Sequence, residues 1–148
     1  MGISTKTRYA LRAMLYMAIN GGKDKPISLR EISKAEKITI DYLIQIFQIL
    51  KKRNLVRSIR GPRGGFVLKK SPDKLSLYDI ARALGEEPVD NFCAKNIVTC
   101  KKLSECIVKY FWKDLRNYIN SYCKKVTLSE IIKNYGGRFI YERTEKKD

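Results

Sequence analysis

Three cysteines in the second half of this 148-residue chain have a spacing that could hold a metal centre. Six residues separate Cys93 from Cys100, five separate Cys100 from Cys106, and three lysines lie among them. A short loop can bring three thiolates to one centre, and nearby lysines offset the negative charge of a cluster. The chain has no histidine, and structural zinc usually takes four Cys or His ligands. An iron–sulfur cluster therefore fits this set better than zinc, with three ordinary cysteines or a redox-active thiol pair as the alternatives.

The fourth cysteine, Cys123, is predicted to be a buried packing residue. A helical pattern covers about 105–123, with apolar side chains on one face. If Cys106 and Cys123 share that helix, their 17-residue separation corresponds to roughly 25 Å at about 1.5 Å per residue. Both thiols cannot then reach the same metal.

A second candidate site is a basic turn at residues 60–65, Arg-Gly-Pro-Arg-Gly-Gly. Proline fixes φ, and glycine supplies the positive φ that a chain reversal needs. Apolar residues alternate on both sides of this turn, which predicts two short strands. A hairpin with Arg60 and Arg63 at its tip suits a groove lined with phosphates, although an isolated basic hairpin is equally often a solvated loop.

The overall charge favours a polyanionic partner. Lysine and arginine number 31 against 15 acidic residues, which gives a net charge of +16. Such a field favours nucleic acid or an anionic membrane surface. No uninterrupted apolar run reaches membrane-spanning length, and charged residues interrupt the N-terminal apolar segment, so we expect a cytoplasmic protein without a membrane anchor. Without histidine or a Gly-rich phosphate loop, we expect no enzyme.

The elements that position these sites are predicted from apolar spacing. Helices are expected over 9–20, 28–37 and 38–54, followed by the hairpin, which is the order of a winged helix-turn-helix domain. In the first helix the apolar residues recur at helical spacing: Leu11, Met14, Leu15, Ala18 and Ile19. The third helix would bury Leu43, Ile46, Phe47 and Leu50. Capping boxes are predicted at Ser28 with Glu31, Ser76 with Asp79, and Thr127 with Glu130.

Four segments are expected along the chain. Residues 1–85 form the mainly α, winged helix-turn-helix domain, and residues 86–104 form a loop that bears cysteines. Residues 105–136 form a long helix and a short terminal helix, and residues 137–148 form a frayed tail. The aromatic stripe of the long helix favours a homodimer interface, with packing back onto its own domain as the alternative.

Several stretches of the chain resemble the Rrf-two family of winged-helix transcription regulators. They are "STKTRYALRAMLYMA", "SLREISKAEKITIDYLIQIFQILKKRNLVRSIRGPRGGFVL", "LSLYDIARAL" and "TLSEII". The resemblance implies a homodimer on a palindromic double-stranded DNA operator, with long crossed helices joining the subunits. It also implies that Cys93, Cys100 and Cys106 hold a 2Fe-2S or 4Fe-4S cluster.

Three positions depart from the family pattern. Lys109 and Arg8 stand where two branches of the family keep the fourth cluster ligand. Ile44 stands where many members have glutamate on the third helix, and isoleucine can contact a thymine methyl group but cannot accept a hydrogen bond from cytosine. The operator preference is therefore expected to differ.

We interpret the chain as a sequence-specific DNA-binding repressor whose affinity depends on the cluster. The expected DNA contacts come from the starts of the first three helices and from the hairpin: Ser4, Thr5, Arg8, Ser28, Thr39, Tyr42, Ile44, Gln45, Arg57, Ser58, Arg60 and Arg63. Tyr42, Ile44 and Gln45 would read bases, and the others would mostly contact phosphates. The alternative is a metal-free regulator of the same fold that responds through thiol redox chemistry or a protein partner.

Overall fold

The computed structural model describes residues 3–88 and 100–145. The elements are α1 (Thr5–Asn20), α2 (Leu29–Glu36), α3 (Ile40–Lys52), β1 (Val56–Ile59), β2 (Gly65–Leu68), the 3-10 helix η1 (Pro72–Lys74), α4 (Leu77–Ala83), α5 (Lys109–Lys125) and α6 (Leu128–Glu145). The predicted fold class is confirmed, because the chain is mainly helical with one antiparallel two-stranded sheet. Among the residues described, no helix has the length and apolar character needed to cross a membrane.

Helix α3 supplies the centre of the core. Leu43, Ile46, Phe47 and Leu50 are all buried, at the predicted spacing of i, i+3, i+4 and i+7. They pack with buried residues of α1, α2, the strands and α4 in one cluster. Because this face of α3 is fixed in the core, its opposite face is held towards solvent.

The predicted apolar stripe of α1 lies at the edge of its buried face. The buried residues are Thr7, Ala10, Ala13, Met14 and Met17, whereas Ile19 is 53% exposed. Leu11, Leu15 and Ala18 are half-buried and pack against the core. Small alanine side chains at the centre of this face let neighbouring helices approach α1 closely. Helix α1 also begins earlier than predicted, at Thr5, because the Ser4 side chain accepts a hydrogen bond from the Thr7 amide.

One of the three predicted capping boxes is complete, and the other two show the hydrogen bond from the amide to the cap side chain. Ser76 and Asp79 form the complete box. Ser28 and Thr127 each accept a hydrogen bond from the amide three residues on. The Glu31 carboxylate accepts a hydrogen bond from the Tyr16 hydroxyl, which ties α2 to α1. Each of these caps fixes the residue at which its helix begins. These helices either carry candidate site residues or support a helix that carries them.

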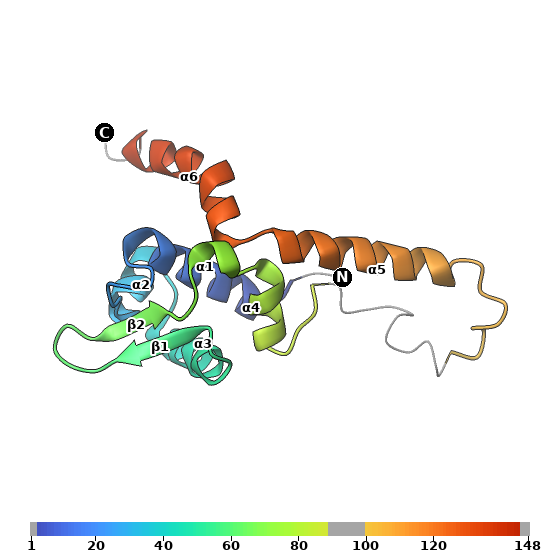
Figure 1. Ribbon diagram of the computed structural model, residues 1–148, viewed down its shortest axis with the longest axis horizontal. Coiled ribbons are helices and arrows are strands. Elements are labelled where there is room, and N and C mark those ends of the chain that lie inside the picture. The colour runs from blue at the N-terminus through green and yellow to red at the C-terminus, as the bar shows by residue number, and fades with distance from the viewer. Residues whose placement is uncertain (1–2, 89–99, 146–148) are drawn as a thin grey trace.

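The hairpin formed by β1, β2 and their connecting turn (residues 56–68, the wing) is attached to the segment before α2. Val56 pairs with Leu68 and Ile59 with Gly65, as the alternating pattern predicted. Phe66 also forms an antiparallel bridge with Ile27, through two backbone hydrogen bonds of 2.9 Å. The wing is therefore joined edge to edge to the helix-turn-helix and lies beside α3 (Figure 1).

The C-terminal helices differ from the prediction in their bounds. Helix α5 begins at Lys109 rather than near 105, so Cys106 lies before the helix and the premise that it shares a helix with Cys123 is wrong. Helix α6 continues to Glu145, past the predicted short helix and into the segment predicted to be a frayed tail. Gly136 and Gly137 lower helix propensity but keep their amide donors, so they do not end the helix. Helix α5 projects away from the winged domain (Figure 1).

We predict that Gly65→Ala destabilises the fold by about 2–4 kcal/mol. Gly65 has φ of +154°, and a Cβ atom there would lie 2.4 Å from the Ile27 carbonyl oxygen. Chemical denaturation monitored by circular dichroism measures the loss. Gly137→Ala in α6 is the control, because its Cβ would meet no atom within 4 Å and alanine favours a helix by about 1 kcal/mol or less. Equal stability of the two variants would contradict the prediction.

Candidate nucleic-acid interface and cysteine segment

The exposed face of α3 carries polar and apolar side chains near its start and basic ones at its end. Ile44, Gln45 and Gln48 are exposed, and Lys51 and Lys52 follow in the last turn. Thr39 occupies the predicted N-cap position, is exposed and makes no capping hydrogen bond through its side chain. Residues at the start of a helix placed in the major groove contact base edges, so this face has the arrangement of a recognition helix.

Tyr42, one of the three predicted base-reading residues, also packs within the fold. It is half-buried, packs against the core, and its ring meets the Tyr9 ring edge to face with centroids 5.6 Å apart. The guanidinium of Arg12 lies 5.5 Å from the centre of the Tyr9 ring. This packing holds the Tyr42 ring in one orientation at the N-terminal half of α3.

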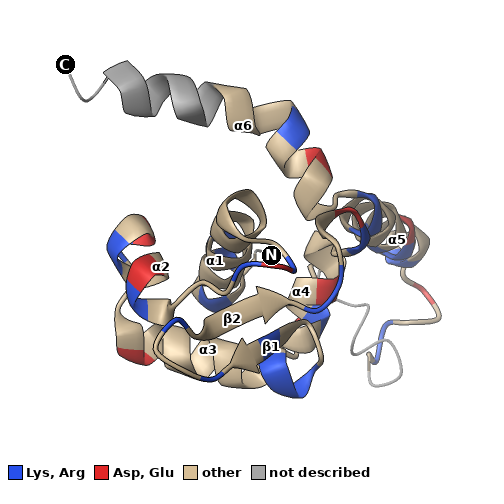
Figure 2. Ribbon diagram, turned by 60° about the vertical axis from the view of Figure 1, so that its left-hand side comes forward, with Lys and Arg blue, Asp and Glu red and all other residues tan. Residues whose placement is uncertain are grey.

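The arginines of the wing are exposed, as a groove-binding hairpin requires. Val56 is buried and Arg57 is exposed, whereas Ser58 is half-buried. Arg60 and Arg63 are exposed in the turn between the strands. Figure 2 shows lysine and arginine residues on the wing and on the neighbouring end of α3. The wing and the C-terminal end of α3 are therefore neighbouring basic regions of the domain.

The start of α1 is tied to the residues before the cysteines. Ser4 and Thr7 both donate hydroxyl hydrogen bonds to the Glu86 carboxylate, at 2.7 Å from Thr7. The Arg8 side chain donates to the Thr5 hydroxyl and is exposed. Thr5 and Arg8 are thus accessible to a ligand, while Ser4 and Ser28 already use their side chains as helix caps.

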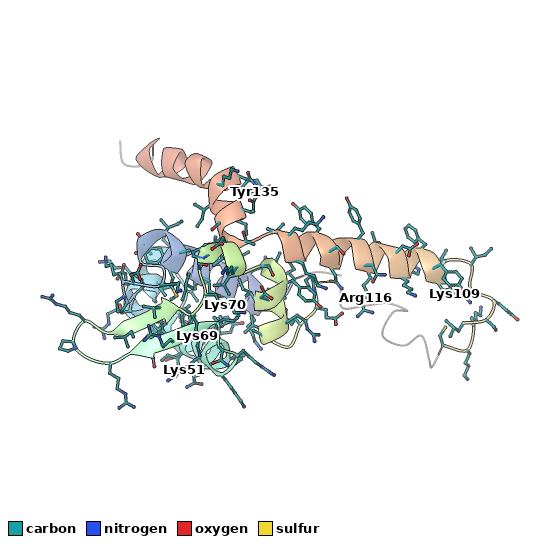
Figure 3. The ribbon with its side chains drawn as sticks, viewed as in Figure 1. Lys51, Lys69, Lys70, Lys109, Arg116 and Tyr135 are labelled. Atoms are coloured by element: carbon teal, nitrogen blue, oxygen red, sulfur yellow. The ribbon has the colours of Figure 1, made fainter. Side chains whose placement is uncertain are left out.

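The basic surface formed by the wing and α3 also includes four lysines. They were not among the DNA contacts predicted from the sequence. Lys51 and Lys52 end α3, and Lys69 and Lys70 follow β2; Lys51, Lys69 and Lys70 are marked in Figure 3. The Lys69 ammonium donates a 2.8 Å hydrogen bond to the Asn54 side chain, just beyond the end of α3. The doublets "KK" at the end of an apolar helix and immediately after an apolar strand are the sequence signal that could have identified them.

Only part of the predicted metal site lies within the described residues. Cys93 lies outside them, Cys100 is exposed, and Cys106 is half-buried. Turns closed by the Cys100, Lys102 and Cys106 carbonyls lead from Cys100 into α5. The Lys109 ammonium donates a 3.1 Å hydrogen bond to the Leu103 carbonyl oxygen. Across residues 3–88 and 100–145, no three Cys, Asp or Glu side chains gather into a group that could hold a metal.

Cys123 is a buried packing residue, as predicted. Its side chain is 4% exposed, and burial raises the pKa of its thiol. Cys123 therefore serves the packing of α5 and lies outside the predicted ligand set.

Glu87 joins the chain just before the three predicted ligand cysteines to two helices. Its carboxylate accepts from Arg82 of α4 at 3.0 Å and from Arg116 of α5 at 2.5 Å. Together with Glu86, it fixes the chain entering the cysteine segment against α1, α4 and α5. A movement of the chain that bears the cysteines would therefore disturb contacts with both the winged domain and the long helix α5.

We predict that iodoacetamide labels the cluster-free, reduced protein at Cys100 before Cys123. Cys100 is exposed, whereas Cys123 is buried and its raised pKa lowers its thiolate population. Peptide mass spectrometry over a time course measures the order. Denaturant should make the labelling rates similar, and equal rates in the native protein would contradict the buried position of Cys123.

Comparison with known proteins identifies the family. The family model described as "Rrf2: Iron-dependent Transcriptional regulator" matches residues 3–134. The transcriptional regulator IscR of Sodalis glossinidius is 35% identical over 134 residues, which are 90% of this chain and 80% of that protein. The structure of CymR, the global cysteine regulator of B. subtilis, has a TM-score of 0.70 and 31% identity, covering 88% of this chain and 95% of CymR.

A second solved structure, T. potens IscR, also has a TM-score of 0.70, at 27% identity, and covers 90% of this chain and 88% of that chain. These relatives are transcriptional regulators rather than enzymes, as the sequence predicted. The winged fold and the family match agree. The chain belongs to the Rrf2 (Rrf-two) family and is a DNA-binding transcriptional regulator.

Proposed function

We propose that this regulator acts in the cytoplasm as a homodimeric repressor on a palindromic double-stranded operator. Helix α3 of each subunit enters the major groove, where Gln45 and Ile44 contact base edges. Arg60 and Arg63 contact phosphates or the adjacent minor groove, and Thr5, Arg8, Thr39 and Arg57 contact the backbone around them. The observation that carries the proposal is the exposed face of α3 beside an exposed, arginine-tipped wing in a chain of net charge +16.

The proposed dimer forms through α5. Tyr110, Phe111, Tyr118 and Tyr122 on this helix are each more than half exposed, and Ile107 just before it is 92% exposed. A group of exposed apolar and aromatic side chains such as this is costly to leave in water and is typical of a protein interface. Pairing of two α5 helices would cover it and would place two α3 helices for the two half-sites of an operator.

The proposed regulatory site is an iron–sulfur cluster on Cys93, Cys100 and Cys106. Two of the three proposed donors support this site, because Cys100 is exposed and Cys106 is half-buried in a segment of tight turns. When bound, the cluster supplies a redox-sensitive or labile centre. Glu86 and Glu87 anchor the chain just before this segment, so loading the cysteines would bear on α1 and α5.

The alternative is control by thiol chemistry without a metal. Its support is the similarity to CymR, described as a cysteine regulator, together with the exposed Cys100 thiol and the half-buried Cys106 thiol. Oxidation or modification of these thiols would then act on the same anchored segment.

We predict that Arg60→Ala with Arg63→Ala weakens operator binding and its salt dependence. Each lost phosphate contact lowers the magnitude of the slope of log K against log salt by about 1. Fluorescence anisotropy on a selected operator between 50 and 300 mM salt gives both values. Lys113→Ala with Lys133→Ala is the charge control, because it removes the same charge from exposed positions of α5 and α6. Unchanged affinity and slope in the wing variant would refute the proposed role of the wing.

We predict that anaerobic purification yields a coloured protein that contains iron and acid-labile sulfide. Cys93→Ala, Cys100→Ala and Cys106→Ala should each abolish the visible absorbance, because each removes one ligand. Cys123→Ala is the matched control and should keep the colour, since its thiol is buried away from the proposed ligands. A colourless wild-type protein without iron or sulfide would instead favour control by thiol chemistry.

A further inference from the structure

Two isoleucines on α3 lie outside the core that the rest of the helix builds. Ile40 and Ile44 are each 39% exposed, whereas Leu43, Ile46 and Phe47 beside them are at most 1% exposed. Four residues apart, Ile40 and Ile44 are neighbours on one face of the helix. They form a small apolar surface on the side of α3 that faces away from the core.

Basic residues outnumber acidic ones around this apolar pair. It occupies the N-terminal half of α3, where Asp41 is exposed in the first turn, and the last turn carries Lys51 and Lys52. Arg57 and the tip arginines lie on the wing, which packs beside α3 through the Phe47 and Phe66 rings. A partner that matches both features must be polyanionic and must also present small apolar groups. Duplex DNA meets both requirements, because each thymine displays a C5 methyl group in the major groove between the two phosphate backbones.

We propose that Ile40 and Ile44 together read thymine methyl groups at neighbouring positions of each operator half-site. This inference rests on the proposed function of α3 as the recognition helix. Side chains at i and i+4 are about 6 Å apart along the helix, at about 1.5 Å per residue, so one pair spans more than a single base step of about 3.4 Å. Ile40 extends the apolar contact beyond that of Ile44, and Gln45 adds hydrogen bonding to an adjacent base.

The chemical test replaces single thymines by deoxyuridine, which removes only the methyl group and keeps the base pair. An operator is first selected from a random duplex library with the full-length protein. Each thymine of one half-site is then replaced in turn, and dissociation constants are measured at fixed salt. Burial of one methyl group corresponds to about a fourfold change in affinity, so we expect about fourfold weaker binding at two or more neighbouring thymines.

Variants assign this discrimination to the two side chains. Ile40→Ala and Ile44→Ala should each bring the ratio between thymine and deoxyuridine close to one at the base that the deleted side chain contacts. Ile19→Ala is the matched control, since Ile19 is an equally apolar, exposed helical residue on α1. This variant should keep the full wild-type discrimination.

The outcomes separate this inference from the proposed function. Selection of no operator at all would overturn both. Tight, selective operator binding that ignores every change from thymine to deoxyuridine would overturn the role of the isoleucines and leave α3 as the recognition helix. Unchanged discrimination in both isoleucine variants, or a change only in their oligomeric state, would likewise overturn it.

Discussion

Phe66 holds the wing and helix α3 together. Its backbone pairs with Ile27 just before α2, and its ring meets the Phe47 ring of α3 with centroids 4.9 Å apart. Gly65 permits this approach, because any side chain there would strike the Ile27 backbone. The arginines at the wing tip are therefore carried on a structure with a defined position relative to α3, which lowers the conformational entropy lost when both contact one duplex.

The cysteine segment is connected to this DNA-binding unit through two acidic residues. Glu86 accepts hydrogen bonds from both Ser4 and Thr7 at the start of α1, and Thr7 is fully buried. Glu87 bridges Arg82 and Arg116, on α4 and α5. A buried hydroxyl that loses its acceptor costs about 1–3 kcal/mol. A change at the cysteines that displaced these carboxylates would thus alter the position of α1 at a measurable energetic cost.

Much of the fold could be predicted from the sequence, because the apolar spacing of α3 and the turn residues of the wing have few alternative interpretations. The inner face of α1 could not, because close packing favoured Ala10 and Ala13 over the larger Leu11 and Leu15. The wing was predicted as a hairpin, but its bridge to Ile27 is a long-range contact that no local pattern contains. Similarly, the role of Glu86 depends on Ser4 and Thr7, about 80 residues away in the chain, and the DNA-contact residues themselves remain predictions.

The central claim is that the wing and α3 form one rigid DNA-binding unit through Phe66. Native-state hydrogen exchange of the Phe66 and Ile27 amides, resolved by nuclear magnetic resonance, tests it most directly. These two amides should exchange as slowly as the amides of Ile46 and Leu50 in the core of α3, because opening the bridge would require the core to unfold. Exchange of the Phe66 amide as fast as that of Arg63 at the exposed tip would show a wing that moves independently, and would contradict the account.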